Sequence, residues 1–451
     1  MKKNILVGLF VFLCSSIGVS AQTVSPSPTP TRPRITTPNP SVSPSPTPLP
    51  RGVIITNNLP PAQIPAPRPT VTPTPYPATA PIQNPTPAQP TPTQLYPLLS
   101  PSPTPRPAPT FYKPLSFAQI KKELAEAKRE MQARPLLTAL TDGTFTNNVV
   151  RIAFYDYKTA KLDYIVMTKD SFLAKEAEIP VTTTEGKLVT VKNIRANGVN
   201  TPVMIIDAEN KAQLPLMVQY PVERDGSFYE MAYYISTHPG IVTPEVVNAG
   251  RIYVRNILET ARTNLQKKGV YISPQVADMA ERLSIVEHVD HLRFRSEYAL
   301  NIFNDIYALY ALNEGQTYRY SVSSAGAGGM VQMIPSTYNM IRSRYYTVGL
   351  MPDFVEGMRN HTNAATAMLL YMQMTWDDLR SNETINAALA NDVAMPAELM
   401  SAGYNSNPAK LAGYIKRGGE NWRNLIPRET QIYLQINSSM DRFMPYIPRT
   451  K

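Results

Sequence analysis

The stretch NEGQTYRYSVSSAGAGGMVQMIP, residues 313–335, decides the fold prediction because it joins a carboxylate, a run of small residues and an amide set among apolar residues. Glu314 follows an apolar stripe at three-to-four-residue spacing, which predicts a helix with one buried face that ends near Asn313. There the negative end of the helix dipole and desolvation by an apolar floor would both raise the pKa of the carboxyl group. A carboxyl group that is protonated near neutral pH can act as a general acid.

The residues after Glu314 decide how it is interpreted, since alone it is an ordinary helix end before a Gly315 stop. The small side chains of SSAGAGG, residues 323–329, let a backbone and a ligand approach closely. The run MVQMIPST, residues 330–337, predicts that an apolar helix resumes, with the Gln332 amide in need of a partner. A phosphate-binding loop is disfavoured, because its Lys and Ser/Thr and the preceding strand are missing.

This stretch resembles the signature of the soluble lytic murein transglycosylase family, the SLT domain. The residues that keep the spacing are Glu314, Ser323, Gly326, Ala327, Gly329, Gln332 and Pro335. Three later blocks agree in order and kind: NHTNAATAMLLYM (360–372) resembles the helix behind the site, SAGYNSNP (401–408) the family's Tyr-Asn segment, and IPRETQIYL (426–434), with one extra residue, its Pro-Glu-Thr segment. The resemblance covers about residues 290–440.

The resemblance implies a mostly helical, lysozyme-like domain that cleaves the β-1,4 bond between N-acetylmuramic acid and N-acetylglucosamine in peptidoglycan glycan strands. A single Glu acts as acid on the leaving oxygen and then as base on the muramyl 6-hydroxyl, which closes a 1,6-anhydro ring. The resemblance assigns the acid/base role to Glu314. It implies substrate contacts for Ser323 and Gln332 in the saccharide subsites, Tyr404 and Asn405 beside the acid, and Glu429 and Tyr433 on the groove wall. It implies no metal and no other cofactor.

Departures from the family pattern leave two alternatives open. Gly315 stands where the family has Ser directly after the Glu, and Asn407-Pro408 replaces Gly-Pro in the Tyr-Asn segment. The first alternative is a lysozyme-like muramidase that hydrolyses the same bond with water. The second is a catalytically inactive peptidoglycan-binding or scaffold protein.

Other titratable residues carry weaker signals. His288 and His291 in EHVDH are three residues apart, but the HExxH spacing of zinc sites is absent, so solvated or capping histidines are expected. A second carboxylate facing Glu314 would favour a water-using hydrolase. Asp305, Asp353 and Glu356 have no motif support for that role and are expected to be surface charges.

The first 21 residues are typical of a secretory signal peptide. Lys2 and Lys3 precede an apolar run from Ile5 to Val19, and small residues end at Ala21. The only cysteine of the chain, Cys14, lies inside the apolar run and follows Leu13, which disfavours a lipoprotein cleavage site. An exported protein of the periplasm or cell envelope is therefore expected.

Residues 22–115 are predicted to form a disordered, Pro-rich tether. They contain 30 of the 45 prolines, six basic residues and no acidic residue. Two further lysines belong to the signal, so only +2 of the net charge of +10 remains for residues 116–451. This disfavours nucleic acid as a partner, which requires basic charge clustered on a folded surface. Cell-wall, divisome or secretion proteins are the partners expected for the tether or the module that follows it.

The chain is predicted to be an α+β multidomain protein. A β-rich accessory module (116–242) opens with a Ser116–Gln119 capping box and contains about six strands, with a hairpin turn at Asp225-Gly226. Hydroxyl N-caps before Pro244 and Pro274 begin a helical connector, residues 243–289. The lysozyme-like catalytic domain is predicted to span residues 290–451.

Overall fold

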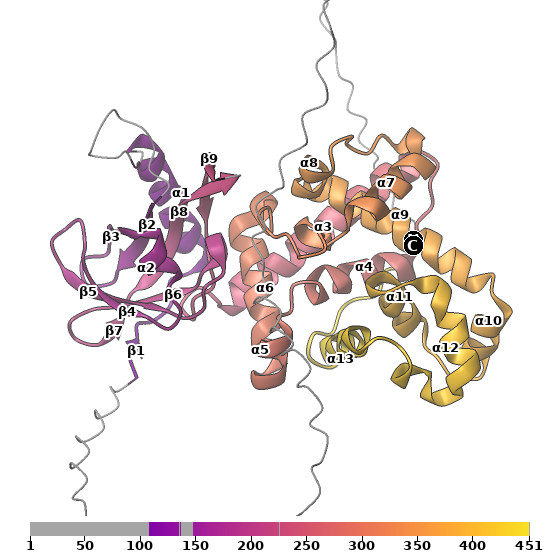
Figure 1. Ribbon diagram of the computed structural model, residues 1–451. Helices are drawn as coiled ribbons and strands as arrows, with labels where there is room; N and C mark the ends of the chain where they lie inside the picture. Colours follow the sequence, from indigo (N-terminus) through magenta and orange to yellow (C-terminus); the bar gives the residue numbers. More distant parts are fainter. Residues whose placement is uncertain (1–107, 135, 137–147, 225, 451) are drawn as a thin grey trace, which may run out of the picture. The chain divides into compact units, whose positions relative to one another are not determined.

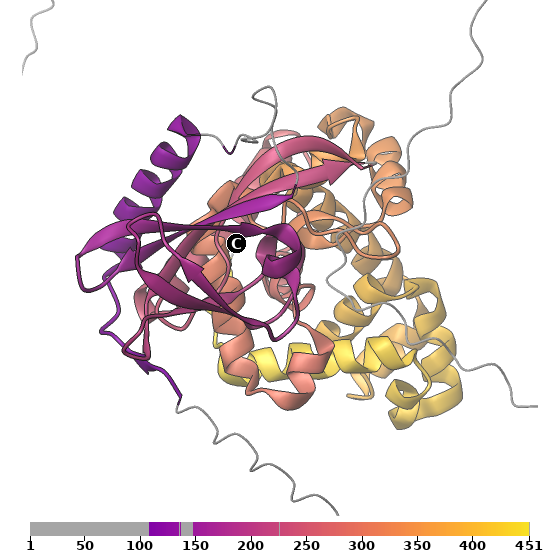
Figure 2. The same cartoon turned by 60° about the vertical axis from the view of Figure 1, so that its left-hand side comes forward.

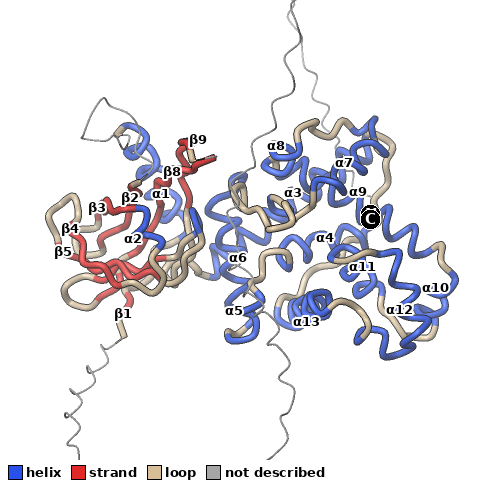
Figure 3. The backbone as a smooth tube through the Cα atoms, viewed as in Figure 1, coloured by secondary structure: helices blue, strands red, loops and turns tan. Residues whose placement is uncertain are grey.

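The computed structural model describes residues 108–134, 136, 148–224 and 226–450. All of these residues belong to one compact unit of the chain. The signal peptide and most of the tether that the sequence predicts lie outside the described residues. The described chain contains both helices and strands, with the strands before residue 235 and most helices after residue 243, as Figure 3 shows.

The strands form two sheets. One has the order β1-β7-β6-β5-β4 and the other the order β3-β2-β8-β9. The neighbouring strands are antiparallel except for the short parallel pair of β1 and β7. The strand bounds are β1 Thr110–Phe111, β2 Val149–Asp156, β3 Lys161–Thr168, β4 Glu178–Thr182, β5 Leu188–Asn193, β6 Val203–Ile206, β7 Lys211–Ala212, β8 Leu214–Arg224 and β9 Ser227–Tyr234.

All six strands expected from the apolar and aromatic runs are present, as β2, β3, β5, β6, β8 and β9. Arg224 pairs with Ser227, which confirms the predicted hairpin turn. Three strands were not predicted. The edge strand β4 contains Pro180, which an edge tolerates because its N–H side need not pair. The other two, β1 and β7, have only two residues each, and β1 lies in the last part of the predicted tether.

The helices begin where the sequence places their caps. Ser116 and Gln119 form the predicted capping box, and the hydroxyls of Thr243 and Ser273 accept from the backbone N–H groups three residues later. The helix bounds are α1 Phe117–Ala133, α2 Lys169–Leu173, α3 Pro244–Lys267, α4 Pro274–Val286, α5 His291–Ser296, α6 Ala299–Asn313, α7 Pro335–Arg344, α8 Phe354–Arg359, α9 His361–Arg380, α10 Glu383–Ala390, α11 Pro396–Asn405, α12 Leu411–Gly418 and α13 Arg428–Phe443 (Figure 1).

Helices α3 and α6 pack closely at Gly250. A Cβ atom at Gly250 would overlap the carbonyl of Tyr307, so only glycine permits this approach of the two backbones. Tyr310, one turn further along α6, is fully buried and donates to the carbonyl of Ser284 on α4, 2.9 Å away. These contacts fix the ends of α4 and α6 relative to each other.

Helix α1, drawn in indigo in Figure 2, packs on β8, and its buried face belongs to a cluster that also includes α6. Ile120 and Leu124 of α1 share a buried cluster with Leu214 of β8 and Ala308 of α6. At the C-terminal end of α6, the Asn313 amide forms two hydrogen bonds with the backbone of Ile235, of 3.0 and 2.9 Å. The strands are thus joined to α6 by apolar packing and by a buried amide.

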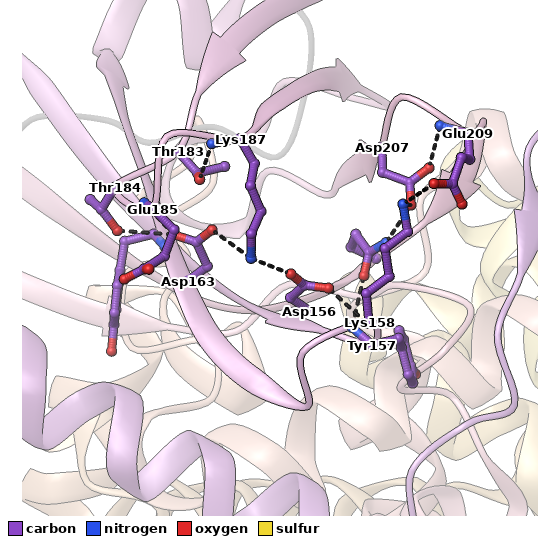
Figure 4. Close-up of polar contacts among 12 residues, drawn as sticks. Asp156, Tyr157, Lys158, Asp163, Thr183, Thr184, Glu185, Lys187, Asp207 and Glu209 are labelled. Carbon is purple, nitrogen blue, oxygen red and sulfur yellow. Dashed lines mark hydrogen bonds and ion pairs between the residues drawn. The ribbon is translucent and has the colours of Figure 1, made fainter.

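In and near the sheets, buried carboxylates form ion pairs with lysine side chains. Lys187 points between Asp156, 2.5 Å from its Nζ, and Asp163, 3.8 Å away (Figure 4). Burial alone would raise the pKa of Asp156. The contact with Lys187 and the hydrogen bond from Lys158 lower it, and the net result is a pKa below the ordinary value. Lys158 pairs in the same way with Asp207, 3.2 Å away. These pairs explain how a β-rich module accommodates acidic residues in its interior.

The C-terminal segment is anchored by Arg449, whose side chain is only 3% exposed. Its guanidinium lies 2.7 Å from Asp278 and 2.7 Å from Glu281 on α4, and it also pairs with Glu259 on α3. The segment therefore ties the two helices together. No helix within the described residues has the length and apolar character that a membrane span requires.

Candidate functional site

Helix α4 places Glu287 at the end of a buried apolar segment. The helix begins at the Ser273 cap with Pro274 in its first turn, and most of its residues are buried. Glu287 is the C-cap, and its N–H donates to the carbonyl of Leu283, 3.0 Å away. The carboxylate thus lies at the negative end of a helix that solvent reaches only in part, and that position disfavours a negative charge.

The Glu287 carboxyl is held by Tyr433 of α13, whose hydroxyl donates to Oε1 at 2.6 Å. Burial raises the pKa of Glu287 to about 8. The negative charge of Glu429 raises it further, whereas the hydrogen bond from Tyr433 lowers it. The group is therefore protonated near neutral pH, which is the state that a general acid needs. The residue as a whole is half-buried.

Tyr404 of α11 lies beside the same carboxyl. Burial raises the pKa of its hydroxyl well above the ordinary value, and the negative charge of Glu287 adds to this effect. The hydroxyl donates to the carbonyl of Val331, 2.6 Å away, and the ring meets Tyr371 of α9 edge-on. Tyr404 therefore links the helix that carries the Tyr-Asn segment to the glycine-rich loop.

The helices α11 and α13 are joined next to the site by Asn405. Its Oδ1 accepts a hydrogen bond from the hydroxyl of Thr430, 2.9 Å away. Glu429 precedes Thr430 in the first turn of α13 and is exposed. Of the residues named from the resemblance, Tyr433 donates to Glu287, and Tyr404 and Glu429 interact with it electrostatically. Asn405 joins the two helices that carry them.

His288, the residue after Glu287, packs against the glycine-rich loop. It is neither solvated nor a helix cap, contrary to the expectation from sequence. Burial lowers the pKa of its imidazole to about 3, so the ring is neutral. Nε2 donates to the carbonyl of Met330, 3.0 Å away, and the ring stacks on Tyr318. Because His288 and Tyr404 hold consecutive carbonyls, the loop at residues 330–331 is fixed beside Glu287.

The glycine-rich loop is shaped by the two polar residues that the sequence singles out. Ser323 Oγ accepts from the N–H of Ala327 at 3.0 Å, which closes the turn. Gln332 does not lie in a resumed helix, because its backbone is left-handed (φ 45°) and α7 begins only at Pro335. Its amide donates to the carbonyl of Gly329 at 2.8 Å and to Ser321 Oγ at 3.3 Å. Both side chains therefore make contacts that maintain the loop.

Glu314 lies in different surroundings. Its side chain is 54% exposed and pairs with Lys121 of α1, 2.9 Å away, so the expected apolar floor is absent. Its backbone has φ 41°, which is unusual for a residue other than glycine. Its charge raises the pKa of Tyr253, although burial is the larger cause. The structure therefore brings Tyr404 and Tyr433 together with Glu287 and does not bring them to Glu314.

Sequence reasoning missed Glu287 because it relied on a fixed nine-residue offset to Ser323. Helices α5 and α6 separate Glu287 from the glycine-rich loop along the chain, and packing restores the contact through His288 and Met330. The signal that could have found it is the run SIVE (284–287), which ends an apolar helix with a carboxylate.

The other carboxylates considered from sequence are paired. Asp305 lies 2.7 Å from Arg293, Asp353 caps α8, and Glu356 pairs with Arg359, 2.9 Å away. In the part of the chain that the structure describes, no three His, Cys, Asp or Glu side chains are grouped as a metal site would need.

Comparisons with known proteins leave the geometry as the basis for assigning a function. No protein-family model matches the chain, and no match was found among the curated proteins or the solved structures.

Proposed function

We propose that the chain is an exported peptidoglycan lytic transglycosylase with a lysozyme-like catalytic domain, and that Glu287, not Glu314, is its acid/base. The observation that carries the proposal is the Glu287 carboxyl, whose pKa burial raises to about 8 and whose position the Tyr433 hydroxyl fixes at 2.6 Å. The resemblance of the glycine-rich loop and of the Tyr-Asn and Pro-Glu-Thr segments supports the substrate class.

In the proposed reaction, protonated Glu287 gives its proton to the glycosidic oxygen as the bond to the muramyl C1 breaks. The resulting carboxylate then removes the proton of the muramyl 6-hydroxyl, whose oxygen attacks C1 and closes the 1,6-anhydro ring. One carboxyl group thus performs both transfers and ends protonated. Tyr433 keeps the carboxyl oriented, and Tyr404 keeps the glycine-rich loop beside it.

A hydrolase is the second candidate, and Glu429 favours it. The charge of Glu429 raises the pKa of Glu287, so a second carboxylate acts on the first, and a two-carboxylate glycosidase needs such a pair. Glu429 is exposed in the first turn of α13 and would act from the groove wall.

The test is to incubate the purified full chain with murein sacculi and to identify the products by mass spectrometry. Anhydro-muropeptides support the transglycosylase, whereas reducing ends that disappear in Glu429→Gln support the hydrolase. Glu287→Gln should abolish product, and Glu314→Gln is the matched control that should retain it. Loss of product in Glu314→Gln with full activity in Glu287→Gln would reject the assignment to Glu287. Sacculi that are bound but remain uncut would indicate an inactive binding protein.

A further inference from the structure

We propose that an open pocket between α3 and α9 binds the carboxylate of a short acylated peptide. The pocket has a volume of about 300 Å³, the lower limit of typical ligand pockets. Its walls come from the last turns of α3, the first turns of α9 and the loop at residues 348–351. None of the residues that line it belongs to the Glu287 site.

The pocket is formed before any ligand arrives, because the loop at residues 348–351 is anchored at both ends. The carbonyl of Val348 accepts a hydrogen bond from Lys268 of α3. The N–H of Met351 donates to Asn363 Oδ1 of α9, 2.9 Å away. Between them Gly349 adopts φ +72°, a backbone conformation that side chains disfavour. A fixed wall lowers the conformational entropy that a ligand must overcome.

The charge of the pocket favours an anion. Lys268 is the only charged residue among those that line it, and no Asp or Glu does. Its ammonium group has three N–H donors, of which Val348 uses one. Lys268 is exposed on the surface side, so a carboxylate can reach it from solvent.

The remaining lining fits a peptide better than an inorganic anion. Asn264, Asn360 and Thr362 supply amide and hydroxyl groups, which can both donate to and accept from peptide groups. Met351, which is half-buried, supplies apolar surface for a small alkyl side chain. Phosphate or sulfate would leave this surface and the amide acceptors unused. Where the proposed function holds, the peptide attached to the glycan offers such a carboxylate, but the pocket does not depend on that function.

The test is a ligand-observed NMR titration of the full chain with N-acetyl-alanyl-alanine and with its C-terminal amide. The acid should bind with a dissociation constant of about 1 mM, as expected for a ligand of this size. The amide should bind about tenfold more weakly, because it lacks the charge-assisted hydrogen bond to Lys268. Equal affinity for the two compounds, or no binding of the acid at about ten times that concentration, overturns the proposal.

Two pairs of variants locate the site. Lys268→Met should weaken binding of the acid about tenfold, whereas Lys267→Met on the same helix end should not. Asn264→Asp adds a carboxylate to the pocket and should weaken binding of the acid about as much as Lys268→Met does. Asn256 is exposed two turns earlier on α3, and Asn256→Asp should have no effect on binding. Lys268 also anchors Val348, so its replacement can disturb the fold. If Lys268→Met does not fold, Asn264→Asp provides the test. Unchanged binding in Asn264→Asp overturns the proposal.

This outcome is separable from the test of the proposed function. Glu287→Gln leaves the α3–α9 pocket intact and should bind the acid as the unmodified chain does. If sacculi remain uncut while the acid binds through Lys268, the proposed function fails and the pocket assignment stands. If sacculi are cut while the acid does not bind, the reverse holds.

Discussion

At neutral pH the Glu287 carboxyl holds a proton because its environment disfavours the charged form. Burial is the main cause, and the nearby Glu429 charge acts in the same direction. The histidine beside it is neutral for the same physical reason, since burial disfavours a charged imidazole. The end of α4 therefore presents a proton donor, and no cation among the described residues contributes to the shift in its pKa.

This environment predicts how stability depends on pH. The folded-state pKa of Glu287 lies at about 8, above its ordinary value of 4.5, so the folded chain keeps a proton that the unfolded chain releases. The contribution to stability is full below the ordinary value and is lost as the pH rises through 8. Glu287→Gln should therefore resemble the unmodified chain near pH 5 and exceed its stability by about 2–4 kcal/mol at pH 8.

Urea unfolding at the two pH values measures this difference. Glu314→Gln serves as the control, because Glu314 is exposed and its replacement should give no comparable gain between pH 5 and pH 8. An equal stability difference between Glu287→Gln and the unmodified chain at both pH values would contradict the assignment of a protonated Glu287.

Burial sets the upper pH limit of the proposed activity, and the Tyr433 hydroxyl moves that limit to lower pH. Its hydrogen bond lowers the pKa of Glu287, so Tyr433→Phe should raise that pKa further. Cleavage of sacculi, which should decline as the pH rises through 8 in the unmodified chain, should then decline at a higher pH. Rates measured between pH 6 and pH 10 test this shift, and Tyr371→Phe, which keeps the ring beside Tyr404, should leave the limit unchanged. A limit that moves to lower pH would contradict the prediction.

At the scale of the elements, the close approach of α3 and α6 depends on one glycine. Gly250→Ala should reduce the free energy of unfolding by about 3 kcal/mol or more, because its Cβ would overlap the Tyr307 carbonyl and separate the helices. Gly413→Ala in α12 is the matched control. Its Cβ would meet only the end of a flexible Arg417 side chain, so the helix propensity of alanine should make it neutral or slightly stabilising. Thermal unfolding of both variants tests this prediction. Equal unfolding midpoints would show that α3 and α6 are not in tight contact at Gly250.

Helices and strands with a periodic apolar pattern were predictable from the sequence. Elements that form only by pairing with a distant segment of the chain were not. The caps at Thr243 and Ser273 and the apolar strands are local signals, and they occur where expected. The two-residue strands exist only because a distant segment pairs with them. The same distinction applies to the site. Motifs indicated Tyr404 and Tyr433, but which carboxyl they surround depends on how α4 packs against α11 and α13.

At the scale of the whole molecule, the C-terminal segment closes the helical part through Arg449. Arg449→Met should reduce the free energy of unfolding by about 3–5 kcal/mol at pH 7, because the carboxylates of Asp278 and Glu281 would lose their buried partner. The loss should be smaller at pH 4, since burial already raises the pKa of Glu281 and it then takes up a proton.

Urea unfolding at pH 7 and pH 4 tests the role of Arg449, with the exposed Arg442→Met as control. Equal losses of stability in the two variants, or a loss in Arg449→Met that does not depend on pH, would show that the buried ion pairs contribute little.

The amide of Asn313 has a mechanical consequence. It forms two hydrogen bonds with the backbone of Ile235, just after the end of β9, through a donor and an acceptor on the same amide group. A pulling force applied at residue 108 would first peel the two-residue β1 from β7 one pair at a time. The two bonds at Ile235 must break together, so in a pulling experiment Asn313→Ala should lower the force at which the end of β9 separates from α6.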